Sequence, residues 1–168
     1  MVESQDNPWL VLRTKSRHEN LVEQVLQQKQ IVAYLPRRRV VRCWQGHKRT
    51  TDMPLFPGYL FVRPRSDQYE SMRYIRGSCG PVLAADSRPA HLPERDVAAV
   101  RLLSESGTAV TVDDGLAIGQ RVKVVAGPFK GVEGALVHVK NQDLLVINVE
   151  LVNSSVRVEV GREALEAL

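Results

Sequence analysis

The segment at residues 54–63, which reads Pro-Leu-Phe-Pro-Gly-Tyr-Leu-Phe-Val-Arg, constrains the fold more than any other part of the chain. Its central Pro-Gly pair suits a type II turn, because proline presets a negative φ and glycine adopts the positive φ that other residues resist. After the turn, the residues follow the two-residue period of a β-strand. We therefore expect Tyr59 and Phe61 on one face of a strand and Leu60 and Val62 on the other.

Two interpretations of this strand fit the spacing. If Leu60 and Val62 face the core, Tyr59 and Phe61 cover something else, and clustered exposed aromatic side chains usually mark a partner surface. In the other interpretation, all four side chains belong to the core of the domain itself.

The pattern of residues 8–105 predicts helices packed on a mainly antiparallel sheet, which is an α+β fold. Ser16 and Glu19 have the spacing of a capping box, so a helix should begin there and run to about residue 30. The basic segment at residues 37–49 predicts a hairpin with Gln45-Gly46 near its tip.

The rest of the chain has a different pattern. Residues 106–116 are small and polar, as in a linker. From Ala117 onward, apolar residues alternate, and glycine or asparagine interrupts the pattern, which is typical of a small SH3-like β-barrel. The sequence therefore predicts a first domain at 8–105, a linker and a second domain at 117–168, in which residues 162–168 add at most a helical turn.

Positive charge is concentrated in the first part of the chain. Residues 1–105 contain 17 Lys and Arg against 11 Asp and Glu, whereas residues 106–168 contain 6 against 8. This asymmetry predicts that only the first part contacts nucleic acid strongly, and that the second part binds protein.

Several functional classes find no support in the composition. Residues 1–7 lack the pattern of a secretory signal and no long apolar run follows, so we expect a cytoplasmic protein without a membrane segment. Cys43 and Cys79 are expected to be free thiols. Cys43 and His47 make half a zinc site, and no catalytic or phosphate-binding motif is present, so we expect no metal, no cofactor and no enzymatic activity.

Three segments, at residues 8–12, 54–63 and 127–134, resemble the NusG family of transcription elongation factors, in the order found in that family. The resemblance implies an N-terminal NGN-type domain that binds RNA polymerase and a C-terminal KOW domain, in a monomer. Residues 149–151 and 155–160 resemble the specialised UpxY-type and RfaH-type paralogs, which act as antiterminators on selected operons.

The resemblance also implies sites. The residues matching the surface that grips the clamp helices of the largest polymerase subunit are Phe56, Pro57, Tyr59 and Phe61, and Trp9 and Leu55 are expected to support them. The residues matching the face that touches the non-template DNA strand are Lys15, Lys29 and Arg76. The KOW domain would contact ribosomal NusE or another protein through Phe129, Lys130 and Val152.

The basic hairpin extends the candidate nucleic-acid surface. Contact with a single strand needs cations together with stacking partners. The hairpin residues that meet this need are Arg37, Arg38, Arg39, Arg42, Trp44, Lys48 and Arg49. The alternative is that this run of charge is only a solvated surface.

The chain departs from its relatives at two places. Gln68-Tyr69-Glu70 occupies the position of the His-Thr-Thr element by which RfaH contacts the polymerase gate loop. Val152-Asn153-Ser154 aligns with the Phe-Gly-Arg turn that general NusG proteins use toward NusE or Rho. These departures weaken the expectation of a gate-loop bridge and of ribosome or Rho contact.

The resulting prediction is a non-enzymatic elongation and antitermination factor that docks on the clamp helices, contacts upstream non-template DNA and suppresses pausing and termination. The alternatives are a general NusG protein and an RNA-binding or ribosome-associated KOW protein. RfaH-like relatives can also hold the C-terminal domain as a helical hairpin. Here the valine content and the glycines of residues 127–134 favour the barrel.

Overall fold

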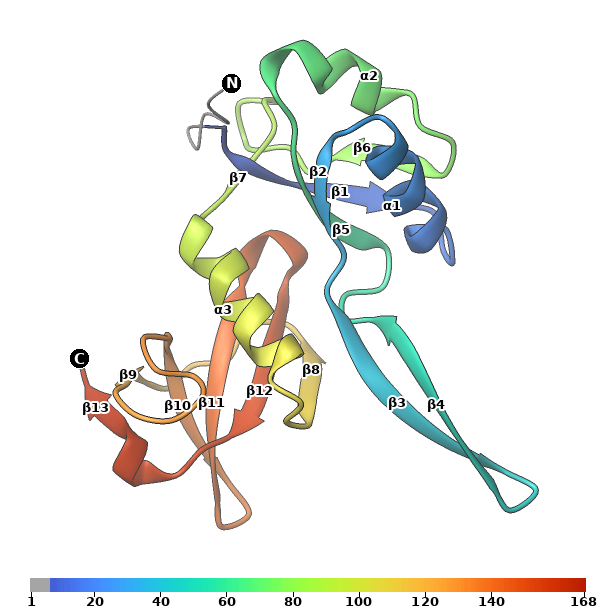
Figure 1. Ribbon diagram of the computed structural model, residues 1–168. Coiled ribbons are helices and arrows are strands. Elements are labelled where there is room, and N and C mark those ends of the chain that lie inside the picture. Colours follow the sequence, from blue (N-terminus) through green and yellow to red (C-terminus); the bar gives the residue numbers. More distant parts are fainter. Residues whose placement is uncertain (1–6) are drawn as a thin grey trace. The chain divides into compact units, whose positions relative to one another are not determined.

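The computed structural model describes residues 7–168, which form two compact units (Figure 1). The first unit comprises residues 7–36 and 56–94, and the second comprises residues 37–55 and 95–168. The strands pair antiparallel, and helices accompany them, so the predicted α+β class is confirmed. No helix within residues 7–168 is long and apolar enough to span a lipid bilayer.

The first unit is built around a five-stranded antiparallel sheet with the order β2-β5-β1-β6, in which β7 also pairs with β1. The strands are β1 (Trp9–Thr14), β2 (Val32–Tyr34), β5 (Tyr59–Arg63), β6 (Ser78–Pro81) and β7 (His91–Leu92). The helices are α1 (Glu19–Gln28) and α2 (Tyr69–Arg73), and the 3-10 turn η1 (Ser66–Gln68) leads into α2.

The hydrophobic core of the first unit lies between the sheet and these helices. Leu60 and Val62 of β5 belong to it, as the alternation predicts. The other members of this core are Leu10, Leu12, Val22, Leu26, Ile31, Leu35, Met72 and Ile75. Because α1 and α2 both contribute to it, they cover the same face of the sheet. The opposite face carries the aromatic side chains.

The capping box predicted for α1 is wrong. The helix begins at Glu19, His18 precedes it, and no side chain caps its first turn. Glu19 is instead buried, and its Oε1 accepts a hydrogen bond of 2.8 Å from the backbone N–H of Gly58. A buried carboxylate needs a donor, and here a distant turn supplies it, which spacing along the chain does not reveal.

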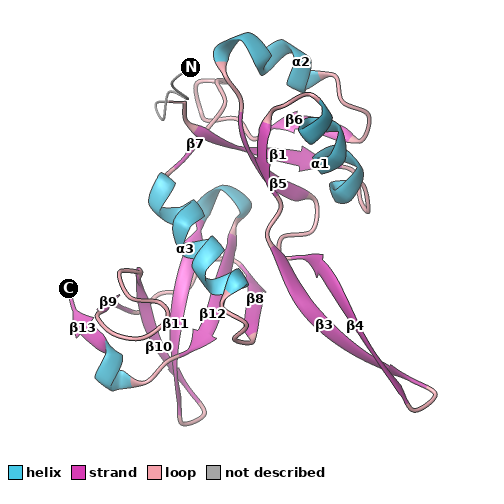
Figure 2. Cartoon of the chain, in the orientation of Figure 1, coloured by secondary structure: helices cyan, strands magenta, loops and turns pink. Residues whose placement is uncertain are grey.

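Residues 37–54 form the predicted basic hairpin. Strands β3 (Arg37–Trp44) and β4 (His47–Pro54) pair along their whole length, and no third strand joins them in the part of the chain that the structure describes (Figure 2). Gln45 and Gly46 connect them with φ values of 48° and 79°. Two consecutive positive φ values are typical of a type I′ turn, whose twist matches that of a two-stranded ribbon. The predicted tip is therefore confirmed.

The second unit also contains the KOW sheet, whose six strands pair antiparallel in the order β13-β9-β10-β11-β12-β8. The strands are β8 (Val110–Asp114), β9 (Gln120–Val124), β10 (Glu133–Val139), β11 (Gln142–Val149), β12 (Ser154–Glu159) and β13 (Leu165–Ala167). The helical elements of this unit are α3 (Glu94–Glu105), η2 (Glu150–Val152) and η3 (Arg162–Ala164). The C-terminal domain thus has the β form that its valines and glycines favour, not the helical hairpin.

Two segments differ from the sequence-based expectation. Strand β8 lies inside the predicted linker at residues 106–116 and pairs with β12, where Val112 lies opposite Val156. Alternating β-branched residues favour a strand even in a short polar segment. Residues 162–168 form strand β13 as well as a helical turn. The limits of the two domains remain a prediction.

Candidate functional site

An aromatic cluster lies on the face of the first sheet that α1 and α2 do not cover. We call it the aromatic face, and its members are Trp9, Tyr34, Phe56 and Phe61. The ring of Phe61 is central, with its centroid 6.3 Å from that of Tyr34 and 6.0 Å from that of Phe56. Strand register explains this arrangement, because Tyr34 of β2 and Val11 of β1 both lie opposite Phe61. Residues directly opposite each other in an antiparallel sheet share a face.

Polar contacts fix Trp9 at the edge of the aromatic face. Its indole Nε1 donates a hydrogen bond of 2.9 Å to Glu94 Oε2. The guanidinium carbon of Arg63 lies 5.6 Å from the centroid of the Trp9 ring, and Arg63 Nη1 lies 3.6 Å from the same Glu94 oxygen. Arg63 Nε also donates to the carbonyl of Asn7 at 2.7 Å. These contacts satisfy the indole N–H, so the ring can pack on apolar neighbours.

The turn before β5 positions Phe56 and Tyr59. Gly58 has a φ of 85°, and the N–H of Tyr59 donates to the carbonyl of Phe56 at 3.0 Å, as in the predicted type II turn. Both backbone groups of Gly58 are also engaged, since its N–H donates to Glu19 and its carbonyl accepts from the N–H of Thr14 at 2.9 Å. The turn is thereby tied to α1 and to β1.

Most of the predicted polymerase-binding side chains are enclosed. The exposed fractions are 5% for Trp9, 2% for Phe56 and 0% for Phe61. Leu55 is buried, Tyr59 is half-buried and Pro57 is exposed. Phe61 is therefore part of the core in this structure, as in the second of the two interpretations, and its role in polymerase binding stays a prediction. Alternation determines the face on which a side chain lies, but it does not determine what covers that face.

The hairpin has a surplus of positive charge beside an exposed aromatic ring. Trp44, next to the tip, is 76% exposed. Of the predicted cations, Arg38, Arg39, Arg42, Lys48 and Arg49 are exposed, and Arg37 is half-buried. Asp52 is the only acidic residue of this segment, and its Oδ1 lies 3.8 Å from Arg39 Nε. The combination of cations and an exposed ring suits single-stranded nucleic acid.

The other predicted nucleic-acid residues lie on the first unit and are all exposed. The N–H of Lys15 donates to the carbonyl of Gly77 at 2.8 Å, so the chain at Lys15 lies next to the segment that contains Arg76. Lys29 Nζ donates to Ser71 Oγ at 3.1 Å, which places Lys29 against α2.

Tyr74 is a candidate stacking residue that the sequence analysis missed. It is 78% exposed, and the guanidinium carbon of Arg73 lies 5.8 Å from the centroid of its ring. The run Arg-Tyr-Ile-Arg at residues 73–76 places an aromatic side chain between two cations, and this pattern could have identified it.

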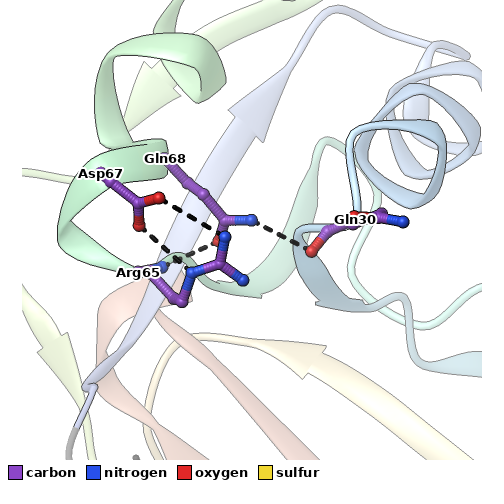
Figure 3. A network of polar contacts seen from close by, with 4 residues as sticks. All are labelled: Gln30, Arg65, Asp67 and Gln68. Carbon is purple, nitrogen blue, oxygen red and sulfur yellow. Dashed lines mark hydrogen bonds and ion pairs between the residues drawn. The ribbon is translucent and has the colours of Figure 1, made fainter. Parts of the chain in front are cut away.

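Gln68, at the position of the RfaH gate-loop element, is part of a polar network (Figure 3). Its side-chain Oε1 accepts from the N–H of Arg65 at 3.0 Å, and its Nε2 donates to the carbonyl of Gln30 at 3.1 Å. Arg65 Nε donates to Asp67 Oδ1 at 3.2 Å, and this hydrogen bond lowers the pKa of the Asp67 carboxyl. Gln68 is buried and holds η1 against the end of α1, so its amide is engaged within the fold.

The zinc half-site of the sequence analysis is not assembled. Register places Cys43 opposite Lys48 and His47 opposite Trp44, so Cys43 and His47 lie on opposite faces of the hairpin. Within residues 7–168, no three side chains of His, Cys, Asp or Glu gather as a metal site.

Of the predicted KOW contacts, only Lys130 lies at the surface. Phe129 and Val152 are each 5% exposed. The N–H of Lys130 donates to the carbonyl of Gly127 at 3.2 Å, and the N–H of Gly131 donates to that of Val124 at 2.8 Å. The loop therefore folds back on the barrel with Phe129 buried, and contact of Phe129 and Val152 with a partner stays a prediction.

The loop before β9 presents apolar side chains that the sequence analysis did not single out. Leu116 is 49% exposed and Ile118 is 97% exposed. Between them, the N–H of Ala117 donates to Asn148 Oδ1 at 2.9 Å, and Asn148 Nδ2 donates to the carbonyl of Ala117 at 2.8 Å. The two hydrogen bonds fix this loop on β11.

Comparison with known proteins agrees with this architecture. The family model described as "Transcription termination factor nusG" matches residues 7–101, and the KOW motif model matches residues 118–160. The chain belongs to the NusG family. Its members include transcription termination and antitermination factors.

Two relatives and one solved structure extend the comparison. The transcription termination/antitermination protein NusG of Streptococcus pyogenes serotype M3 is 30% identical over 162 residues, covering 88% of this chain and 90% of that protein. The protein of the same name from Staphylococcus aureus is 26% identical over 175 residues, covering 95% of both. A structure titled "Domain interaction in Thermotoga maritima NusG" aligns over 97% of this chain and 98% of that one, with a TM-score of 0.56 and 20% identity. This last likeness shows a shared fold.

Proposed function

We propose that this NusG-family protein is a specialised antitermination factor of the UpxY or RfaH type, which binds the polymerase clamp helices through its aromatic face and suppresses pausing and termination in the cytoplasm. The observation that carries the proposal is the position of that face. It lies opposite the side on which α1 and α2 pack, and it gathers Trp9, Phe56 and Phe61 beside the turn at Gly58.

The energetics fit a reversible contact. Burying one large apolar side chain contributes about 1.5–3 kcal/mol, from which the cost of association is subtracted. The rings of Phe56 and Phe61 are enclosed in this structure. Half-buried Tyr59 and exposed Pro57, at the border of the face, are the residues that a partner can meet first.

The mechanism that we propose is a shift of a conformational equilibrium. A factor that binds the closed clamp more tightly than the open clamp stabilises the closed form by the difference in binding free energy. The exposed cations Lys15, Lys29 and Arg76, together with the hairpin, supply a second contact with the upstream non-template strand.

The turn at Val152-Asn153-Ser154 favours a specialised factor over a general NusG protein. Asn153 has a φ of 46°, so the chain keeps a left-handed residue where general NusG proteins have the glycine of Phe-Gly-Arg. The aromatic and arginine side chains of that turn are absent, and Val152 is buried. We infer that ribosomal NusE is a weaker partner of this barrel than of a general NusG protein.

The rival function is an RNA-binding or ribosome-associated KOW protein. Such a protein would carry its cations around the KOW loops, but Lys130 is the only cation of residues 125–135. The surplus of positive charge lies in the first part of the chain instead.

Polymerase binding and transcription through a pause site and a terminator test the proposal. Tyr59→Ala should weaken binding to core polymerase about 10-fold, which corresponds to the loss of one half-buried ring. The factor's reduction of pausing should become smaller to a similar extent. For binding to core polymerase, which contains no DNA, Tyr74→Ala is the matched control, because it removes an exposed tyrosine from another part of the same unit.

Phe56→Ala combined with Tyr59→Ala should abolish detectable binding. Circular dichroism checks the fold, since Phe56 is buried. A double variant that folds and binds polymerase like the wild type would remove the proposed docking site. Equal action at every gene tested, with no recruiting element, would favour the general NusG alternative.

A further inference from the structure

The register of the β3–β4 hairpin assigns its side chains to two faces. Residues directly opposite each other share a face, and successive residues alternate. One face, which we call the tryptophan face, carries the pairs Arg38–Met53, Val40–Thr51, Arg42–Arg49 and Trp44–His47. The other, which we call the cysteine face, carries the pairs Arg37–Pro54, Arg39–Asp52, Val41–Thr50 and Cys43–Lys48.

The two faces differ in how their charges are compensated. On the cysteine face, Arg39 lies 3.8 Å from Asp52, the only acidic residue of residues 37–54. On the tryptophan face, no ion pair joins Arg42 or Arg49 to a carboxylate anywhere in residues 7–168. Arg42 Nη2 lies 3.6 Å from Met53 Sδ, which is a neutral and weak acceptor and leaves the charge uncompensated.

The pairing of Arg42 with Arg49 itself indicates an anionic ligand. Like charges directly opposite each other destabilise a pair of antiparallel strands. An anion bound between the two guanidinium groups would remove this repulsion. The free hairpin therefore carries a local electrostatic cost that binding of a phosphate group would offset.

Trp44 adds a stacking surface at the end of this row of cations. Its side chain is 76% exposed, next to the tip. Each step of two residues along a strand covers about 7 Å, so the Arg42–Arg49 pair lies about 7 Å from Trp44 and Arg38 about 13 Å further. An exposed ring followed at intervals by cations suits a single strand, because a base can stack on the ring and the phosphates along the strand can bind the cations. A duplex does not offer free base faces to such a ring.

We propose that the tryptophan face of the hairpin binds single-stranded DNA, with a base stacked on Trp44 and phosphates bound by Arg42, Arg49 and Arg38, and that the cysteine face takes no part. This assignment rests on the proposed contact with the non-template strand and narrows it to half of the hairpin side chains. It excludes Arg37, Arg39 and Lys48 from the set of DNA-binding residues.

Two variants with equal loss of charge test the assignment on the full-length protein. Arg42→Gln with Arg49→Gln removes two cations from the tryptophan face, and Arg39→Gln with Lys48→Gln removes two from the cysteine face. Fluorescence anisotropy measures binding to a labelled 12-nucleotide single strand at several salt concentrations, without polymerase. The slope of log affinity against log salt should fall in magnitude by about 1.4 for the first variant, at about 0.7 per contact, and stay unchanged for the second.

Trp44 is tested separately. Trp44→Ala should weaken binding about 5- to 150-fold, whereas Val41→Ala, an exposed apolar position on the cysteine face, should leave it unchanged. The chain has two tryptophans, and Trp9 is buried, so quenching of tryptophan fluorescence by added DNA should report Trp44. Trp44→Phe keeps a ring and should retain most of the affinity.

Each other outcome overturns the inference. An equal loss of DNA affinity in the two double variants would mean that DNA is attracted to the whole hairpin without preference for either face. Duplex DNA that binds as tightly as the single strand would remove the stacking role, and tighter binding of RNA of the same sequence would remove the assignment to DNA. A wild-type protein that binds no oligonucleotide would overturn this inference alone, because the polymerase-binding test of the aromatic face does not depend on it.

Discussion

Replacing Glu19 with alanine should lower the free energy of unfolding of the first unit by about 2–4 kcal/mol. Glu19 is 6% exposed, and its Oε1 accepts a 2.8 Å hydrogen bond from the N–H of Gly58. A hydrogen bond to a charged group contributes about 1.5–3 kcal/mol. An acidic side chain in the first turn of a helix adds about 0.3–1 kcal/mol through the helix dipole.

Glu19→Gln separates these contributions. The amide keeps an acceptor oxygen for the turn but loses the negative charge, so its cost should be about 1–2 kcal/mol. Gln24→Ala is the control, because Gln24 is exposed on the same helix and alanine is a good helix former. It should change the stability by less than about 0.5 kcal/mol.

Urea denaturation in a Trp44→Phe background measures the effect, since Trp9 of the first unit is then the only tryptophan. Polymerase affinity should fall together with stability in Glu19→Ala, because the same turn carries Phe56 and Tyr59. Equal stability of the alanine and glutamine variants, or a loss below about 0.5 kcal/mol in Glu19→Ala, would refute the assigned role of this hydrogen bond.

Three further predictions follow from single contacts. Asn148→Ala should destabilise the barrel by about 1–3 kcal/mol in thermal melts, because both backbone groups of Ala117 lose their partner. Gly58→Ala should cost about 1–2 kcal/mol in urea denaturation, because its φ of 85° strains any residue with a Cβ. Burial, and to a lesser extent the charge of Glu150, raises the pKa of Asp96, so the charged carboxylate destabilises the native state at pH values above that raised pKa. Asp96→Asn should therefore raise the Tm at pH 7. The gain in Tm should disappear as the pH falls through the native pKa of Asp96 to below its pKa in the unfolded chain.

Local backbone chemistry made part of this fold predictable. The turns at Gly58 and at Gln45-Gly46 depend on φ preferences that the residues themselves carry, and both are present. The two-residue period of β5 correctly placed Leu60 and Val62 in the core. These features are visible in the sequence because each involves residues that are close along the chain.

Features that depend on distant residues escaped the sequence analysis. The partner of Glu19 lies 39 residues away, so local spacing suggested a capping box in its place. Strand β8 has its pairing partner in β12, which made residues 110–114 read as linker. The enclosure of Phe61 and Phe129 likewise depends on what the tertiary fold places above them.

The candidate sites show the same division. The cations and Trp44 of the hairpin were found from residue type alone, because exposed charge is a common outcome for such a run. Assigning these side chains to the two faces of the hairpin required the strand register, because a shift of one residue in one strand would move each of its side chains to the other face.

The two outer edges of the hairpin affect how the protein behaves in concentrated solution. Within residues 7–168, no third strand pairs with this two-stranded ribbon, and edge strands invite pairing with another copy of the chain. The arginines of the ribbon oppose this by mutual repulsion between molecules, over about 10 Å at 0.1 M salt but only about 3 Å at 1 M. High salt should therefore promote self-association, visible in light scattering, and the same side chains that we assign to DNA also oppose it at low salt.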